Sequence, residues 1–171
     1  MEMHDIFKSF KTRTAQLGDY RVEDMLLSPR HWKKCKLSVN LNWTATKFIK
    51  GNSSSVPKNK KGVYSFVVKP GVANHVDVAY LLYVGKVEKQ SFRDRYQQYL
   101  GHFKQGEKSR WFHVATFLNK WQEYLWFYWA PIQKTHSIGP AETKLISSFL
   151  PPMNHSYKGT VKKEVKLALN R

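Results

Sequence analysis

Residues 62–68 have the sequence GVYSFVV, the strongest β-strand pattern in the chain. The run is β-branched and aromatic, and it lies between a basic loop and the turn residues Lys69-Pro70-Gly71. A second apolar run, AYLLYVG at residues 79–85, follows after further turn residues, so we expect the two runs to pair as an antiparallel hairpin with a long loop. The aromatic run YLWFYWAPI at residues 124–132 predicts a third, buried strand.

Two amphipathic helices are expected between and after these strands. Apolar residues recur every three or four positions from residue 91 to residue 104, which is the spacing of one helix face. Another helix is expected to begin at Pro140, to carry an apolar stripe that includes Leu145 and Ile146, and to end at Pro151-Pro152. The run GNSSSVPKNKK at residues 51–61 has the composition of an exposed loop and marks the clearest boundary in the chain.

The composition indicates one folded domain with a polyanionic partner. The chain has 171 residues, 42% of them hydrophobic, and its 6 Trp, 9 Tyr and 10 Phe can form a dense core. Its 29 Lys and Arg against 12 Asp and Glu give a net charge of +17, which favours nucleic acid first and an anionic membrane surface second.

Cysteine content and hydropathy exclude several other classes of protein. The single Cys35 rules out an intrachain disulfide, argues against a structural zinc site of the usual kind, and favours a reducing compartment. No stretch resembles a membrane span, and the first residues lack the pattern of a signal peptide. We therefore expect a soluble cytoplasmic protein without a membrane partner, and the sequence leaves open whether it is a monomer or a homodimer.

Acidic residues are few in the part of the chain that is expected to form the folded domain, so each is a candidate for acid-base chemistry or metal binding. Glu142 stands out because it lies in the first turn of a predicted helix, far from other acids, with the core-facing Leu145 and Ile146 three and four residues later. We expect it to be partly buried at the rim of the sheet. The simpler interpretation is a carboxylate that complements a helix N-terminus. Between residues 62 and 154 the acidic residues are Asp77, Glu88, Asp94, Glu107, Glu123 and Glu142.

Several residues, taken in order, resemble the motifs of the GIY-YIG nucleases. Gly62-Val63-Tyr64 and Tyr83-Val84-Gly85 on the first two strands resemble the two tripeptides that name this family. Lys86 follows the second tripeptide, and Arg95 on the next helix matches the helix arginine of the family. Glu142 and Asn154 match its closing glutamate and asparagine. The resemblance covers roughly residues 60–155; the loop between the tripeptides is longer than in the shortest members, and Arg93 is a second candidate for the helix arginine.

The resemblance implies an α+β fold, with a central three-stranded antiparallel sheet flanked by helices and an N-terminal extension. It also implies an endonuclease that hydrolyses DNA phosphodiester bonds with one divalent metal, Mg²⁺ or Mn²⁺, in each active site. Such small members resemble restriction, phage or mobile-element enzymes. The limits expected are a basic extension over residues 1–57, a nuclease domain over residues 58–155 and a basic tail over residues 156–171.

The matched residues suit this chemistry. Glu142 would hold the metal, since Mg²⁺ often takes only one or two protein carboxylates. Tyr64 would be a general base or would position water, provided that Lys86 and the metal lower its pKa from about 10. Arg95 would bind phosphate oxygens as a planar fork. Tyr83 would donate a hydrogen bond at the same rim.

Further residues are expected to support the site or to bind nucleic acid. Gly62, Gly85 and Asn154 would be structural residues beside it. The alternative function is a catalytically inactive, basic nucleic-acid-binding protein on the same fold, and RNA in place of DNA is not excluded, because both polymers carry phosphates. The residues expected to bind nucleic acid are Arg93, Lys60, Lys61, Lys104 and Arg110.

Overall fold

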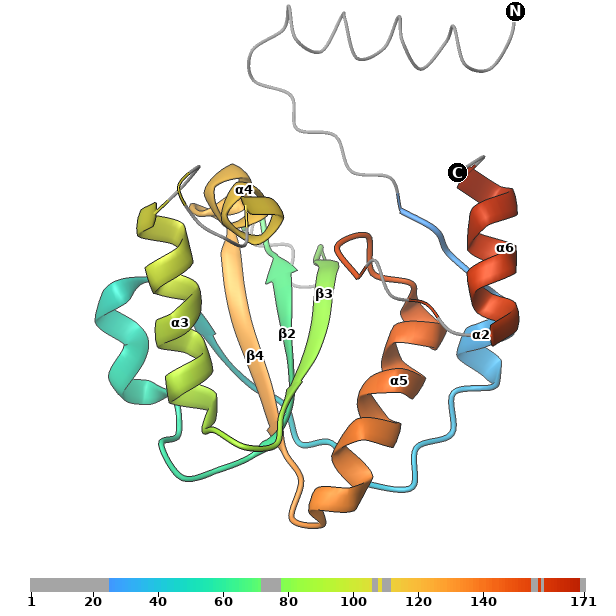
Figure 1. The fold of residues 1–171 in the computed structure, drawn as a ribbon, viewed down its shortest axis with the longest axis horizontal. Helices are drawn as coiled ribbons and strands as arrows, with labels where there is room; N and C mark the ends of the chain where they lie inside the picture. The colour runs from blue at the N-terminus through green and yellow to red at the C-terminus, as the bar shows by residue number, and fades with distance from the viewer. Residues whose placement is uncertain are drawn as a thin grey trace, which may run out of the picture.

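The computed structural model describes residues 25–71, 78–105, 108, 112–154, 157 and 159–169. Four strands form a single antiparallel sheet in the order β1-β4-β2-β3 (Figure 1). Two of them, β2 and β4, are therefore central, and β1 and β3 are the edges. The strands are β1 (Thr44–Lys47), β2 (Gly62–Val68), β3 (Tyr80–Val87) and β4 (Leu125–Pro131).

Strand β2 is apolar throughout because both of its faces are covered. Tyr64 and Phe66 belong to the larger hydrophobic core on one face, whereas Val63 belongs to a smaller core on the other. Strand β4 lies beside β2 and places Phe127 in the larger core and Ala130 in the smaller one. Burial on both faces explains why these strands lack an alternation of polar and apolar residues.

Helices cover both faces of the sheet. Helices α3 (Phe92–Gln105) and α4 (Phe112–Trp121) lie on one side, and α5 (Ile138–Phe149) lies on the other, with α2 (Pro29–Lys33) and α6 (Gly159–Leu169) beyond it (Figure 1). Short 3-10 helices, η1 (Lys50–Ser55) and η4 (Thr135–Ser137), connect these elements.

The start of α3 is fixed by a reciprocal cap. Ser91 Oγ accepts a bond from the Asp94 amide at 3.2 Å, while an Asp94 carboxylate oxygen accepts bonds from the Ser91 amide at 3.0 Å and the Ser91 hydroxyl at 2.7 Å. Such a cap pairs amide groups that the first helical turn leaves without partners. The cap therefore holds the first turn of α3 in place, directly before Arg95.

The predicted antiparallel sheet flanked by helices is confirmed, but the expected number of strands is wrong. The three runs expected as strands form β2, β3 and β4, and the fourth strand, β1, pairs with β4. Only four residues long, β1 carries no periodicity that would separate it from a loop. The helices expected around residues 91–104 and after residue 140 are present as α3 and α5. The sequence did not indicate α4 or α6.

Part of the expected N-terminal extension contributes to the sheet and the core. Strand β1 comes from that segment, and Val56 is fully buried in the larger core. Residues 44–56 thus pack with the segment that was expected to form the domain, and the limits at residues 57 and 155 stay predictions. Of the described helices, none has both the length and the apolar composition needed to cross a membrane.

Candidate active site

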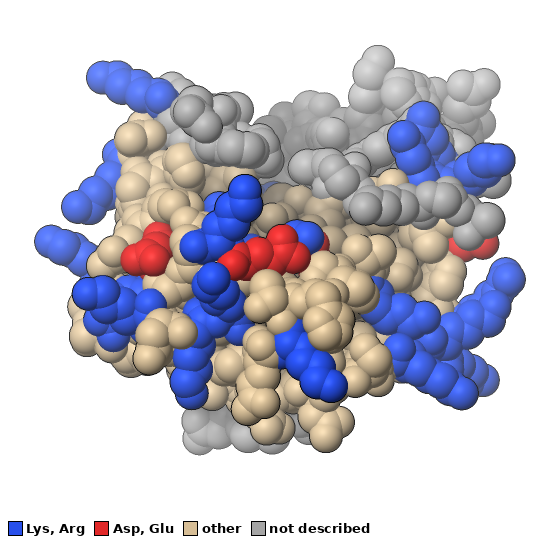
Figure 2. All heavy atoms as spheres, turned by 60° about the horizontal axis from the view of Figure 1, so that its bottom comes forward, with Lys and Arg blue, Asp and Glu red and all other residues tan. Residues whose placement is uncertain are grey.

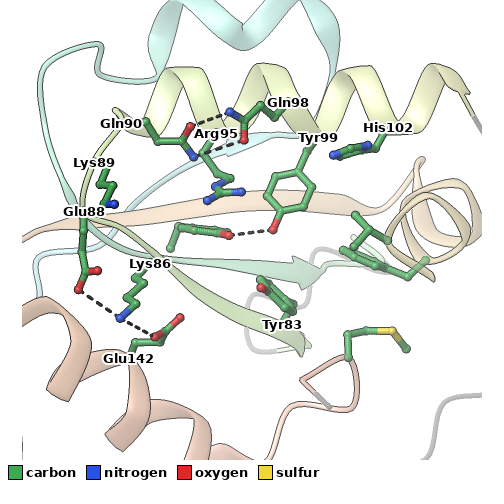
Figure 3. A pocket seen from close by; sticks show the side chains of 14 residues that line it. Tyr83, Lys86, Glu88, Lys89, Gln90, Arg95, Gln98, Tyr99, His102 and Glu142 are labelled. Carbon is green, nitrogen blue, oxygen red and sulfur yellow. Dashed lines mark hydrogen bonds and ion pairs between the residues drawn. The ribbon is translucent and has the colours of Figure 1, made fainter. Parts of the chain in front are cut away.

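A cavity of about 870 Å³ borders the edge strand β3, with α3 on one side and α5 on the other (Figure 3). Five side chains that the resemblance marks as catalytic all line this cavity, although they come from four different elements. The lining residues are Tyr64, Tyr83, Lys86, Glu88, Lys89, Gln90, Arg95, Gln98, Tyr99, His102, Val114, Phe117, Glu142 and Met153.

Tyrosine hydroxyls gather on the α3 side. Tyr64 projects from β2, only 2% exposed, and its hydroxyl shares a hydrogen bond of 2.8 Å with the hydroxyl of Tyr99 from α3. Tyr83 packs against the Tyr64 ring at a centroid distance of 6.1 Å. The tyrosine ring fits because Gly85 lies opposite Tyr64 in the register, where a Cβ atom would come within 2.5 Å of its Cζ and hydroxyl atoms. Gly85 is therefore a structural requirement of the site.

Burial governs the protonation of Tyr64 and Tyr99. Burial raises the pKa of the Tyr64 hydroxyl well above its ordinary value of 10.0, and the neighbouring Tyr99 and Tyr83 add to the rise. Burial likewise raises the pKa of Tyr99. Arg95 acts in the opposite direction but does not reverse the shift, and the expected lowering by Lys86 is not observed. Among these side chains alone, Tyr64 is thus a neutral phenol that can orient water, and a lowering of its pKa by a bound metal stays a prediction.

The two candidate arginines have different partners. Arg95 points into the cavity beside Gln90 (Figure 3). Figure 3 draws the Gln90 amide bonded to Gln98; with the amide turned over, its oxygen accepts bonds from Arg95 Nε at 2.7 Å and Nη2 at 2.9 Å. Arg93 instead donates from Nε to the Val56 carbonyl at 2.8 Å and from Nη2 to the Ser54 carbonyl at 2.7 Å. Arg93 therefore ties α3 to the η1 segment, and Arg95 is the arginine at the cavity.

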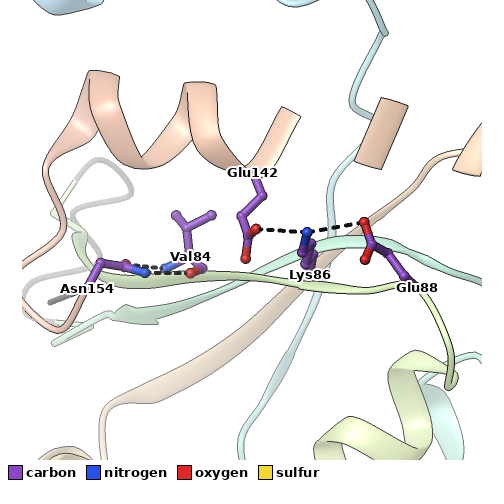
Figure 4. A network of polar contacts seen from close by, with 5 residues as sticks. All are labelled: Val84, Lys86, Glu88, Glu142 and Asn154. Carbon is purple, nitrogen blue, oxygen red and sulfur yellow. Dashed lines mark hydrogen bonds and ion pairs between the residues drawn. The ribbon is translucent and has the colours of Figure 1, made fainter. Parts of the chain in front are cut away.

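A charged network occupies the α5 side. The Lys86 ammonium lies 3.2 Å from a carboxylate oxygen of Glu88 and 3.6 Å from one of Glu142 (Figure 4). Desolvation acts to lower the pKa of Lys86, but the bond to Glu88 and the charges of Glu142 and Glu88 together raise it above its ordinary value. Lys86 is accordingly a charged ammonium at neutral pH, and a donor rather than a base.

Glu142 is partly buried, as predicted, with 20% of its side chain exposed. Two other expectations about it are wrong. Helix α5 begins at Ile138, before Pro140, so Glu142 lies beyond its first turn. Glu142 is also not far from other acids, because Glu88 contacts the same ammonium.

Asn154 and Gly62 support the site from outside the cavity. The Asn154 side chain donates to the Val84 carbonyl and accepts from the Val84 amide, both at 2.8 Å (Figure 4). It therefore occupies the hydrogen-bonding position of a neighbouring strand at the free edge of β3. Gly62 has a φ of 153°, and a Cβ atom there would meet the Ala130 carbonyl of β4, so only glycine fits this close approach.

The donor set of the cavity suits an oxygen-seeking divalent cation. Among the described residues, no three His, Cys, Asp or Glu side chains form a group that could hold a metal. Mg²⁺ needs no such group, because it is commonly bound through one or two carboxylates, with water and phosphate oxygens as its other ligands. Glu142 fits this pattern, with Glu88 close by.

The residues expected to bind nucleic acid are scattered. Lys60 and Lys61 are exposed in the loop before β2, and their carbonyls accept bonds from Phe92 and Ile132. Lys104 lines a separate pocket at the other end of α3, together with Lys47 and Lys50. Arg110 lies outside the described residues. Lys and Arg side chains surround a small central group of acidic side chains on the end of the molecule that is lowest in Figure 1 (Figure 2).

Three residues that lie beside the polar groups of the candidate catalytic side chains had not been selected from the sequence for a role in the site. Tyr99 was assigned only to the apolar stripe of its helix, although it follows Arg95 by four positions and so shares a helix face with it. Glu88 lies two positions after Lys86, which is the same-face spacing of a strand. No sequence signal pointed to Gln90.

Comparisons of this chain with protein-family models, with curated proteins and with solved structures find no match. The function must therefore be argued from the geometry of the cavity.

Proposed function

We propose that this protein is a metal-dependent endonuclease of the GIY-YIG type that hydrolyses phosphodiester bonds in DNA. The observation that carries the proposal is the convergence of Tyr64, Tyr83, Lys86, Arg95 and Glu142 on one cavity. These residues come from β2, β3, α3 and α5. Packing alone has no need for an arginine, a lysine and a glutamate beside buried tyrosines.

The reaction needs a water molecule to attack phosphorus while negative charge builds on the phosphate oxygens. The Arg95 guanidinium, oriented by Gln90, offers a planar fork to those oxygens. Tyr64 and Tyr83, as hydrogen-bond donors at the cavity wall, orient the water and the phosphate. A divalent metal held by Glu142 would act as a Lewis acid and stabilise developing charge on oxygen.

Lys86 gives the site a second fixed cation on the α5 side. Its pKa is raised by Glu88 and Glu142 against the effect of desolvation, so the ammonium keeps its charge at neutral pH. Positive charge from Arg95 on one side and from Lys86 on the other suits an anionic substrate between them. The net charge of +17 extends this preference to a long polyanion.

The test is cleavage of supercoiled plasmid DNA in Mg²⁺ or Mn²⁺, with EDTA as a control, by the native protein and by Glu142→Gln. We expect the native protein to nick or linearise the plasmid and the variant to be slower by at least about a thousandfold, because the carboxylate that would hold the metal is lost. Glu123→Gln is the matched control, since it removes the same charge at an exposed position that does not line the cavity.

Two results would contradict the proposal. One is equal cleavage by the native protein and Glu142→Gln. The other is the absence of cleavage of DNA, RNA and modified DNA while both proteins retard nucleic acid in a salt-dependent way. The second result would favour the inactive binding protein.

A further inference from the structure

Lys86 lies between two carboxylates that belong to different parts of the chain. Its ammonium is 3.2 Å from Glu88, which directly follows β3, and 3.6 Å from Glu142, which projects from α5 (Figure 4). Both carboxylates line the cavity. The ammonium therefore occupies part of the space around Glu142 in which a divalent cation would bind.

The charges set a constraint on metal binding. One ammonium beside Glu142 alone would make a neutral pair, and an incoming divalent cation would be repelled by the ammonium as strongly as it was attracted by the carboxylate at the same distance. Glu88 adds a second negative charge on the opposite side of the ammonium. The three side chains together carry a net charge of −1. Lys89 and Arg95 also line the cavity, so the charge of Glu88 limits the repulsion that a cation at Glu142 would meet.

The surroundings also favour Glu88 as the alternative partner of Lys86. The Glu88 side chain is 39% exposed and the Glu142 side chain 20%, so an ammonium that shifts toward Glu88 moves to the better solvated carboxylate. Space for the pair exists because Gly139, in the first turn of α5, has no side chain. A Cβ atom there would lie 3.2 Å from the Lys86 ammonium and 3.4 Å from the Glu88 carboxylate.

We propose that Glu88 is a positioning residue for the metal: it holds the Lys86 ammonium when a divalent cation takes Glu142. Lys86 then alternates between two carboxylates, and it neutralises part of the charge on Glu142 until the metal arrives. This inference rests on the proposed function, because it requires a metal at Glu142.

The test measures Mn²⁺ binding by titration calorimetry in the absence of nucleic acid, so that catalysis plays no part. We expect Glu88→Gln to weaken Mn²⁺ binding about tenfold relative to the native protein, because Lys86 loses its alternative partner. Glu123→Gln removes an equal charge at an exposed position that does not line the cavity, and should change the affinity less than about twofold. Unfolding midpoints of all variants verify that they are folded.

A double variant separates an indirect role of Glu88 from a direct one. If Glu88 acts mainly through Lys86, Glu88→Gln weakens Mn²⁺ binding clearly less once Lys86→Met is present, by less than about threefold, and Lys86→Met alone binds Mn²⁺ at least as tightly as the native protein. If Glu88→Gln weakens binding equally in both backgrounds, Glu88 is itself a metal ligand and the inference is wrong.

The same titration distinguishes failure of this inference from failure of the proposed function. If Glu142→Gln binds Mn²⁺ like the native protein, or if the native protein binds none, the metal site itself is refuted. If Glu142→Gln loses binding but Glu88→Gln behaves like Glu123→Gln, only the role of Glu88 is refuted.

Discussion

The two sides of the cavity differ in the exposure of their side chains to solvent and in the charge that these side chains carry. On the α3 side, Tyr64 and Tyr99 are 2% and 6% exposed, and burial raises the pKa of both hydroxyls, so that they stay neutral. On the α5 side, the Glu142, Lys86 and Glu88 side chains are 20%, 36% and 39% exposed, and they compensate one another's charge. Burial thus keeps the donors on one side neutral, whereas partial solvation and contacts between opposite charges keep the groups on the other side ionised.

On the α3 side, the largest expected effect on the rate is the loss of the arginine that would bind phosphate. Arg95→Ala should lower the rate of plasmid cleavage about a thousandfold, because the planar guanidinium that would bind the phosphate oxygens is lost and a lysine cannot bind them as a bidentate fork. Arg93→Ala is the matched control: it should change the rate less than about threefold, but lower the free energy of unfolding by about 1 kcal/mol through the bonds lost to Ser54 and Val56. Equal effects on the rate would contradict the assignment of Arg95.

Adding atoms to the tightly packed α3 side should lower the free energy of unfolding more than a change of charge on the α5 side. Gly85→Ala forces a Cβ atom against the Tyr64 ring, so we expect the free energy of unfolding, measured in urea, to fall by about 3 kcal/mol and cleavage to be lost. Gly101→Ala is the control, because no atom lies within 4 Å of the added Cβ position in α3, and it should stabilise the protein by about 0.5–1 kcal/mol. A small effect of Gly85→Ala would mean that Tyr64 can repack without cost.

Strand β3 lies between the two sides of the cavity, and the Asn154 side chain pairs with the backbone of its free edge. Asn154→Ala removes both bonds to Val84 and leaves a buried amide and carbonyl without partners, so the free energy of unfolding should fall by about 2 kcal/mol. Hydrogen exchange at the Val84 amide should become faster. Unchanged protection of that amide would show that Asn154 is not what holds the edge.

The smallest effect is the pH dependence that the buried tyrosines contribute. The folded-state pKa values of Tyr64 and Tyr99 lie above the ordinary value of 10.0, so above about pH 10 the unfolded chain releases phenol protons that the folded chain keeps. Stability is therefore complete below about pH 10 and falls as the pH rises, by up to about 1.4 kcal/mol per pH unit for each such tyrosine.

The measurement is urea unfolding between pH 8 and pH 11. Tyr64→Phe should make the alkaline loss of stability shallower, whereas Tyr80→Phe, at a tyrosine that is 46% exposed, serves as the control. An identical slope in the two variants would contradict the burial argument.

The sequence predicted the central strands and the main helices better than the edge strand β1. Strands β2 and β4 and helices α3 and α5 were recognised because long apolar runs and helical spacing are local signals. Strand β1 was missed because its pairing with β4 depends on a partner far away in the chain. The expected catalytic residues do line one cavity, but Glu88 and Gln90 had no role until folding placed them beside Lys86 and Arg95.

By itself, the sequence determined a basic α+β domain with apolar strands and one ordered set of candidate residues, because composition and periodicity are properties of neighbouring positions. Tertiary structure alone decided which arginine faces the cavity, that Tyr64 stays protonated, and that Lys86 is shared by two carboxylates. These outcomes depend on burial and on distances of a few ångströms between side chains that are remote in the chain, and no local pattern of residues encodes them.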